Sequence, residues 1–224
     1  MPRSDDANEP EKTVEGTSSV PESLDDKRFW NRFAFLYGPF MAKNKRAYDA
    51  LGAHLRSIIE PDMRVLELAC GTGQMTERLA TACGTWIATD FSEKMVARLK
   101  KRKLPGVTAC EVADAADLPY VPGSFDCVLI TNALHIMPNP DIALREVHRV
   151  LGPGGLLIAP TFVYDDTVST ANFRIIESVG FKTRSTWTSD TFCAYVKKHG
   201  FKVASAKVLP GNPASECALV AIAQ

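Results

Sequence analysis

A turn that contains two glycines directly follows the first strongly apolar stretch of the sequence. The stretch runs from Val65 to Ala69, and Cys70-Gly71-Thr72-Gly73 comes next. Glycines at such a position let the backbone turn tightly and approach a ligand closely. Glu67 lies inside the apolar stretch, where an unpaired carboxylate is costly to bury. We therefore expect Glu67 to face a cation or strong donors, such as the ammonium group of an amino-acid-like ligand.

Acidic residues also end or follow the next two apolar stretches. Asp90 ends the stretch that begins at Trp86, and an acid about twenty positions after a glycine turn suits the two hydroxyls of a ribose. Asp90 can equally cap the next helix, because acids favour helix N-termini. Phe91 can lie against an adenine ring. Asp114 can accept a hydrogen bond from an adenine amino group, or simply form a turn.

The glycine turn departs from the fingerprint of nicotinamide dinucleotide sites. Thr76 stands where the third glycine of G-x-G-x-x-G is expected. The sequence also has no Tyr-x-x-x-Lys pair of the kind that short-chain dehydrogenases use. An NAD-dependent oxidoreductase is therefore the less favoured alternative.

Alternating strands and helices must position these residues. Strands are predicted over Arg64–Ala69, Trp86–Asp90, 107–112, Asp126–Thr131, Gly155–Ala159, Phe201–Val208 and Cys217–Ala223. Helices are predicted over 74–83 and 190–199. Two more helices are predicted to begin after N-terminal caps, one at Ser92 and one at Asn139, which has Pro140 in its first turn. This alternation indicates a mainly parallel sheet, and the hairpin at the end adds an antiparallel strand. Parallel strands end at one edge of a sheet, where ligands bind.

Charge and composition limit the class of partner. Lys plus Arg and Asp plus Glu both total 26, which disfavours nucleic acid bound through phosphate neutralisation. The basic run from Arg98 to Lys103 is interpreted as a solvated helix end, with nucleic-acid or anionic-membrane contact as the alternative. The six cysteines form no C-x-x-C pair, so we expect no metal site and a reducing compartment.

Three regions are expected along the chain. Residues 1–24 are acidic and polar and predict a disordered tail. Residues 25–60 are rich in aromatic side chains and predict a helical lid, although packing of these aromatics against the main domain is the alternative. Residues 61–224 form the main domain. No stretch reaches the ~18–20 apolar residues of a membrane span, and the N-terminus lacks the apolar core of a secretion signal. We expect a cytoplasmic monomer or homodimer without stable membrane insertion.

Three segments together resemble class I S-adenosylmethionine (SAM)-dependent methyltransferases. They are Val65–Gly73, Leu118–His135 and Ala143–Gly155, and the resemblance is close over about 63–160. The chain is most similar to methyltransferase type 11-like members that act on small molecules, quinones and lipids. The resemblance implies an α/β, Rossmann-like fold with a seven-stranded sheet of order 3-2-1-4-5-7-6. Strand 7 would be antiparallel, with helices on both faces.

The same resemblance implies a set of SAM-binding residues. It places Glu67, Gly71 and Gly73 at the methionine moiety with Ala69 and Thr72 of the same segment, Asp90 at the ribose, Phe91 and Met95 around the adenine, Asp114 and Ala115 at the adenine edge, and Asn132 toward the sulfonium. An aromatic residue of the N-terminal helices closes over SAM in the related subgroup, and Tyr37 is the candidate here.

The acceptor of the methyl group is less well defined by the sequence. Asn132-Ala133-Leu134-His135 replaces the Asn/Asp-Pro-Pro-aromatic motif of adenine- and glutamine-modifying relatives. We expect in-line transfer from SAM to a small, apolar or aromatic acceptor through O, N, S or C. Apolar walls are predicted from Phe162, Tyr164, Phe173, Phe181, Trp187, Phe192 and Tyr195. His135 is the best-placed general base, with a packing or loop-anchoring role as the alternative. A non-catalytic SAM-binding partner subunit is the alternative function.

Overall fold

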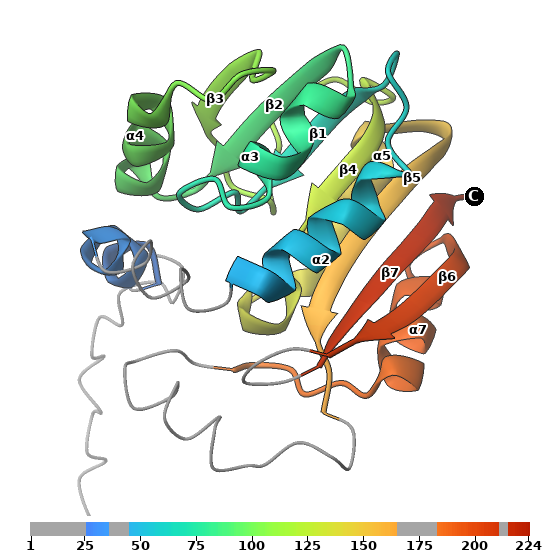
Figure 1. Ribbon diagram of the computed structural model, residues 1–224. Helices are drawn as coiled ribbons and strands as arrows, with labels where there is room; N and C mark the ends of the chain where they lie inside the picture. The colour runs from blue at the N-terminus through green and yellow to red at the C-terminus, as the bar shows by residue number, and fades with distance from the viewer. Residues whose placement is uncertain (1–25, 36–44, 165–182, 211–214) are drawn as a thin grey trace, which may run out of the picture.

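The computed structural model describes residues 26–35, 45–164, 183–210 and 215–224 of the chain. A helix covers residues 26–35. The remaining helical elements are α2 (Lys45–Arg56), α3 (Thr76–Leu79), the 3-10 turn η1 (Ala80–Ala82), α4 (Glu93–Arg102), the 3-10 turn η2 (Leu134–Ile136), α5 (Pro140–Val150) and α7 (Ser189–Lys198). The strands are β1 (Arg64–Leu68), β2 (Thr85–Asp90), β3 (Ala109–Val112), β4 (Phe125–Ile130), β5 (Leu151–Phe162), β6 (Phe201–Leu209) and β7 (Glu216–Ala223) (Figure 1).

One twisted sheet of seven strands organises the described chain, in the order β3-β2-β1-β4-β5-β7-β6. The first five strands are parallel, and β7 runs antiparallel to both of its neighbours. The predicted fold class and strand order are therefore confirmed. Asp90 pairs with Val112 and Leu68 with Ile130, so the carboxyl ends of β1 to β4 lie along one edge.

Two hydrophobic cores lie on opposite faces of this sheet. Successive residues of β4 alternate between them: Cys127 and Leu129 face α2 and α3, whereas Val128 and Ile130 face α5 and α7. This alternation is the period of two expected for a strand that is covered on both sides. The central strands β1 and β4 are almost entirely buried, whereas β3 and β6 at the two sides of the sheet are largely exposed.

The local boundaries differ most from the predictions at two places. The helix predicted over 74–83 is only the four-residue α3 followed by η1, because the turn itself extends to Met75 and Gly73 adopts a left-handed φ of 90°. The fifth strand begins at Leu151 rather than Gly155. Its glycine-rich start is accommodated by a shift in register, since Phe125 pairs with Leu151 but Cys127 pairs with Leu156.

The two predicted helix caps have different outcomes. The Ser92 hydroxyl accepts a hydrogen bond from the Met95 amide at 3.2 Å and so caps α4 as expected. Asn139 occupies the cap position of α5, with Pro140 in the first turn, but its side chain makes no capping hydrogen bond. None of the described helices is long and apolar enough to cross a membrane.

Candidate functional site

A pocket opens at the carboxyl edge of β1 to β4 and contains about 1020 Å³ of space, including its open mouth. Its lining includes Gly71 after β1, Asp90 and Phe91 after β2, Asp114 after β3 and Asn132 after β4. Residues separated by more than 60 positions in the sequence are thus brought to one cavity, as the parallel topology requires.

Two non-glycine residues in the lining have left-handed backbone conformations. Ala69 and Asn132 both have φ of 51°, and they follow the adjacent strands β1 and β4. Such a conformation costs on the order of 1–3 kcal/mol and is kept only where the surroundings impose it. The Asn132 amide donates to the Pro160 carbonyl at 2.8 Å, and the next amide after Ala69 donates to Thr89 at 2.9 Å. Backbone strain therefore concentrates at the pocket, as it does at functional sites.

Glu67 lies beneath the glycine turn rather than in the pocket lining. Its side chain is 2% exposed, and its Oε2 accepts hydrogen bonds from the Thr76 hydroxyl at 2.5 Å and the Trp86 indole at 2.9 Å. Burial raises the pKa of Glu67 to about 7, although both donors lower it. The carboxylate thus has the strong donors that its apolar surroundings require. Thr76, which replaces the third glycine of the dinucleotide fingerprint, is one of these donors.

Asp90 connects the glycine turn to the start of α4. One carboxylate oxygen accepts from the Gly71 amide and the other from the Ser92 amide, both at 2.9 Å. Burial raises the pKa of Asp90 to about 6, and these two amides lower it. Asp90 also lines the pocket, so the residue that orders the surrounding backbone is part of the cavity wall. Its ribose contact stays a prediction.

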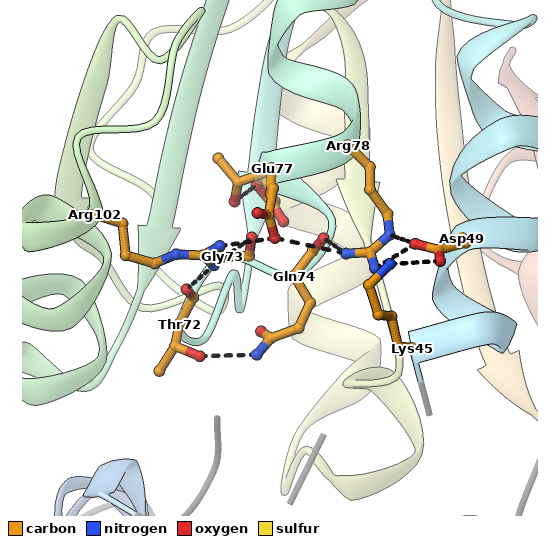
Figure 2. Close-up of polar contacts among 10 residues, drawn as sticks. Lys45, Asp49, Thr72, Gly73, Gln74, Glu77, Arg78 and Arg102 are labelled. Carbon is orange, nitrogen blue, oxygen red and sulfur yellow. Dashed lines mark hydrogen bonds and ion pairs between the residues drawn. The ribbon is translucent and has the colours of Figure 1, made fainter. Parts of the chain in front are cut away.

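The outer side of the glycine turn is held by arginine side chains (Figure 2). Arg102 Nη1 donates to the carbonyls of Thr72 at 2.8 Å and Gly73 at 3.1 Å, and Nη2 forms an ion pair with Glu77 at 2.7 Å. Gly73 itself suits glycine because its φ of 90° would strain any other residue, and a Cβ there would also crowd Leu99 Cδ1 at 2.4 Å. The last turn of α4 therefore fixes the conformation of the predicted cofactor loop.

Arg78 extends this support to α2. It donates to the Gln74 carbonyl at 2.6 Å and forms an ion pair with Asp49 at 2.6 Å, while Lys45 contacts the same carboxylate at 2.9 Å. Thr72 does not line the pocket, and its hydroxyl accepts from Gln74 at 2.8 Å. The basic run around Arg102 is thus partly structural, a role that charge patterning alone did not indicate.

We expect Arg102→Ala to weaken SAM binding about three- to tenfold, because two carbonyls of the turn lose a charged donor. Calorimetric titration of SAM measures the change. The control is Lys101→Ala, which removes the same charge from the same exposed helix end and should leave the affinity within twofold. Equal affinities for both variants would show that Arg102 does not order the loop for binding.

The pocket brings together eight of the predicted cofactor residues. They are Ala69, Gly71, Asp90, Phe91, Met95, Asp114, Ala115 and Asn132. Glu67, Thr72 and Gly73 support the turn from outside the lining, and Tyr37 lies outside the described residues.

The N-terminal helix contributes residues that the sequence reasoning missed. Asp26 and Trp30 line the pocket from helix 26–35. The helix is attached beside the pocket, because Asn31 accepts from the Ser92 hydroxyl at 2.7 Å and Lys27 pairs with Glu93 at 2.5 Å. The four-residue spacing of Asp26 and Trp30 puts both on one helical face, which is the signal that could have identified them. Trp30 is thus the aromatic residue that the described part of this helix presents to the pocket.

His135 is buried behind the pocket rather than in its lining. Its Nδ1 lies 3.1 Å from the Thr161 hydroxyl, and its ring packs edge-on against Phe162. Its carbonyl accepts from the Arg184 and Ser185 amides, which ties η2 to the segment after β5. Burial lowers the pKa of His135 to about 4. These contacts favour the loop-anchoring interpretation, and the role of general base stays a prediction.

The aromatic residues that were predicted to form the walls of the acceptor pocket also lie outside the pocket lining, as far as they belong to the described residues. Trp187 packs against Phe192 and Tyr195 at α7, with ring centroids 5.1 and 4.9 Å apart, and Phe192 belongs to the core. None of the three lines the pocket. Phe173 and Phe181 lie outside the described residues. The apolar lining comes instead from residues such as Trp30, Phe91, Met95, Ile136, Met137 and Pro138.

Comparisons with known proteins agree with this fold and pocket. Residues 66–159 match the family model of a methyltransferase domain. The chain is 42% identical over 105 residues to demethylmenaquinone methyltransferase of Mycobacterium bovis, covering 46% of this chain and 43% of that protein. It is 31% identical over 151 residues to 27-O-demethylrifamycin SV methyltransferase of Amycolatopsis mediterranei, covering 64% and 56%. The chain thus spans about half the length of these relatives.

A solved SAM-dependent methyltransferase from Thermotoga maritima has the same fold. It superposes with a TM-score of 0.69 over 88% of this chain and 99% of its own, at 20% identity. The domain between β1 and β5 is therefore a methyltransferase domain. Its fold is that of class I SAM-dependent methyltransferases, and S-adenosylmethionine is the cofactor of this domain.

Proposed function

We propose that the chain transfers a methyl group from SAM to a small apolar or aromatic acceptor. The observation that carries the proposal is the pocket itself, which joins backbone-ordered acids at β2 and β3 to an apolar end around Ile136 and Met137. The two relatives are named for small-molecule acceptors, a quinone and a rifamycin. We further propose that the protein acts in the cytoplasm, as a monomer or homodimer, without a nucleic-acid partner.

The residues of the pocket fit SAM in a defined direction. Asp114 and Ala115 would take the adenine edge, Phe91 and Met95 its faces, and Asp90 the ribose. The aminoacyl end of SAM would then lie along the glycine turn and extend toward Asn132 at the end of β4. The strained backbone at Ala69 and Asn132 supports this assignment, because it lines the part of the cavity where the aminoacyl end would lie.

SAM supplies an activated methyl group on a sulfonium leaving group. The protein then mainly has to orient the acceptor in line and exclude water, which are effects of position rather than of a strong base. Helix 26–35 serves the second purpose by covering one side of the pocket with Trp30. The acceptor loses a proton when an oxygen, nitrogen or sulfur is methylated.

Cofactor choice is tested by thermal unfolding in the presence of SAM or NAD. At about 100 times its Kd, SAM should stabilise the protein by ~2.7 kcal/mol, which corresponds to about 5–10 °C for a chain of this size. NAD should cause no shift. A shift with NAD alone would contradict the proposed cofactor, and a screen with labelled SAM over phenols, thiols, amines, quinols and phospholipids would then test transfer itself.

For His135 we expect an effect on stability rather than on the pH–rate profile. His135→Ala removes the contacts with Thr161 and Phe162, so its melting temperature should fall. Between pH 6 and 8 its rate of methyl transfer should keep the pH dependence of the wild type, because a pKa of about 4 leaves the imidazole neutral throughout. A uniform loss of 10²-fold or more, of the size expected for a missing base, would instead assign His135 the catalytic role.

A further inference from the structure

Asn132 has an unsatisfied polar atom at the pocket wall. Its Nδ2 donates a hydrogen bond to Glu216 Oε1 at 2.5 Å, whereas its Oδ1 is buried and has no hydrogen-bond partner in the described part of the chain. An unpaired buried acceptor costs about 1–3 kcal/mol. The residue also carries a left-handed backbone. A side chain held at such cost beside a cavity indicates that a ligand group completes it.

Glu216 determines which end of the amide is left for a ligand. Because β7 is antiparallel, its first residue lies at the edge where β4 and β5 end (Figure 1). Glu216 is 5% exposed, so its carboxylate needs a donor. Glu216 Oε1 accepts from the amide Nδ2, which leaves the carbonyl oxygen of Asn132 without a partner. The pair therefore holds a buried, unpaired acceptor at the wall of the pocket.

The location of the pair separates it from the proposed nucleoside subsite. Asp90 and Asp114 follow β2 and β3, whereas Asn132 and Glu216 lie beyond β1, on the side of β5 and β7. The neighbouring Thr131 hydroxyl is also buried without a partner among the described residues, and Thr131 lines the same pocket. Ile136 and Met137 make this end of the pocket apolar. Unpaired polar atoms and apolar side chains thus meet at the end away from the nucleoside.

We propose that Asn132, oriented by Glu216, selects acceptors that carry a hydrogen-bond donor on an apolar ring, that is, aromatic alcohols or amines. The inference rests on the proposed methyl transfer and adds the acceptor class. Asn132 accepts a hydrogen bond from the O–H or N–H of the acceptor, and Glu216 is a positioning residue that acts through the amide. Thr131 is a second polar group within reach of the same part of the cavity.

Binding of matched aromatic pairs tests the proposal. The full chain is first saturated with S-adenosylhomocysteine, and calorimetry then compares 1-naphthol with 1-methoxynaphthalene, and 1-aminonaphthalene with its N,N-dimethyl derivative. Wild type should bind the donor-bearing member of at least one pair about tenfold more tightly, as expected for one buried hydrogen bond. Asn132→Gly should reduce this preference to within twofold. Glycine adopts the left-handed backbone without strain, so this variant is suited to fold.

Two further variants separate positioning from general damage. Glu216→Gln can accept or donate, so the amide loses its fixed orientation and the preference should fall about threefold or more. Tyr195→Phe, which removes a hydrogen bond to Asp141 outside the pocket, should keep it. Three outcomes would each overturn the proposal. Wild type could bind the methylated and the donor-bearing rings equally, or it could bind no donor-bearing ring. The preference could also persist in Asn132→Gly.

The cofactor titration distinguishes this inference from the proposed function. Failure of wild type to bind S-adenosylhomocysteine would remove the methyltransferase assignment itself. If Asn132→Gly weakens S-adenosylhomocysteine tenfold but leaves 5′-methylthioadenosine unchanged, the amide serves the ammonium group of the cofactor, and the acceptor assignment is overturned. Unchanged affinity for both nucleosides, with loss of naphthol preference, supports the inference as stated.

Discussion

Asp90→Ala is expected to weaken SAM binding by at least tenfold while the protein stays folded. The substitution removes a charged acceptor for the two ribose hydroxyls, and each hydrogen bond to a charged group contributes about 1.5–3 kcal/mol. It also releases the Gly71 amide, which the carboxylate holds at 2.9 Å, so the glycine turn loses an inner support. Calorimetric titration gives the affinity, and thermal unfolding of the variant shows whether the fold is kept.

A ligand that lacks the hydroxyls separates ribose recognition from loop order. Wild type should prefer S-adenosylhomocysteine over its 2′,3′-dideoxy analogue, and Asp90→Ala should bind the two alike. The loss that remains with the dideoxy analogue measures the contribution of the Gly71 and Ser92 amides. Equal discrimination by both proteins would contradict the ribose assignment even if the overall affinity fell.

The sequence predicted the sheet and the gathering of these residues at one pocket, because both depend on local order along the chain. Each acid follows an apolar stretch, and parallel strands place such residues at one edge. Asp90, Asp114 and Asn132 therefore line one cavity as expected. The resemblance to a known family supplied what periodicity could not, namely the order of the strands and the antiparallel direction of β7.

The supporting contacts were not predictable, because they join residues whose separation in the chain carries no pattern. Asn132 and Glu216 are 84 positions apart, and Arg102 and Thr72 are 30 apart. A left-handed backbone at Ala69 is equally hidden, since alanine gives no sign of positive φ where glycine would. The residue types indicated which side chains could take part in chemistry. Tertiary packing determined which of these side chains are fixed in place and which hydrogen bonds and ion pairs fix them.

His135 is the opposite case, a residue that the sequence assigned to the site and that the structure places outside the pocket lining. Histidine after a strand end is a reasonable base from its usual pKa, but the sequence does not reveal how deeply it is buried. The structure places it against Thr161 and Phe162 with its pKa lowered. Asn132, three positions earlier, reaches the pocket instead. Two polar residues three positions apart thus differ in their surroundings, because Asn132 has a left-handed backbone before the 3-10 turn and His135 lies within that turn.

Glu67→Gln is expected to stabilise the cofactor-free protein increasingly as the pH rises. Burial raises the folded-state pKa of Glu67 from 4.5 to about 7, so the unfolded chain loses its proton first. Wild-type stability from this group is fully present below about pH 4.5 and is lost as the pH rises through 7. Glutamine keeps an oxygen for Thr76 and Trp86 and carries no charge. The difference between the two proteins should therefore grow by about 2 kcal/mol from pH 5 to pH 8.

Urea unfolding at the two pH values measures this difference, which includes the electrostatic coupling between Glu67 and Asp90. A difference that stays constant with pH would show that Glu67 is ionised at ordinary cost in the folded state. Thr76→Val provides a matched test of the opposite sign, because loss of a donor that lowers the pKa should make the wild-type pH dependence steeper.

Glu67→Gln should lower the affinity for SAM, although it raises the stability of the cofactor-free protein. The carboxylate lies beneath the glycine turn, where a negative charge would favour the ammonium end of the cofactor. Wild type should bind SAM more tightly at pH 8 than at pH 6. Glu67→Gln should keep only the part of this trend that Asp90 contributes, and should lose at least threefold in affinity at pH 8. A carboxylate kept for the fold alone would show no such loss. A variant that is more stable and binds less well would instead mean that Glu67 is retained at the expense of stability because the ionised form serves the cofactor.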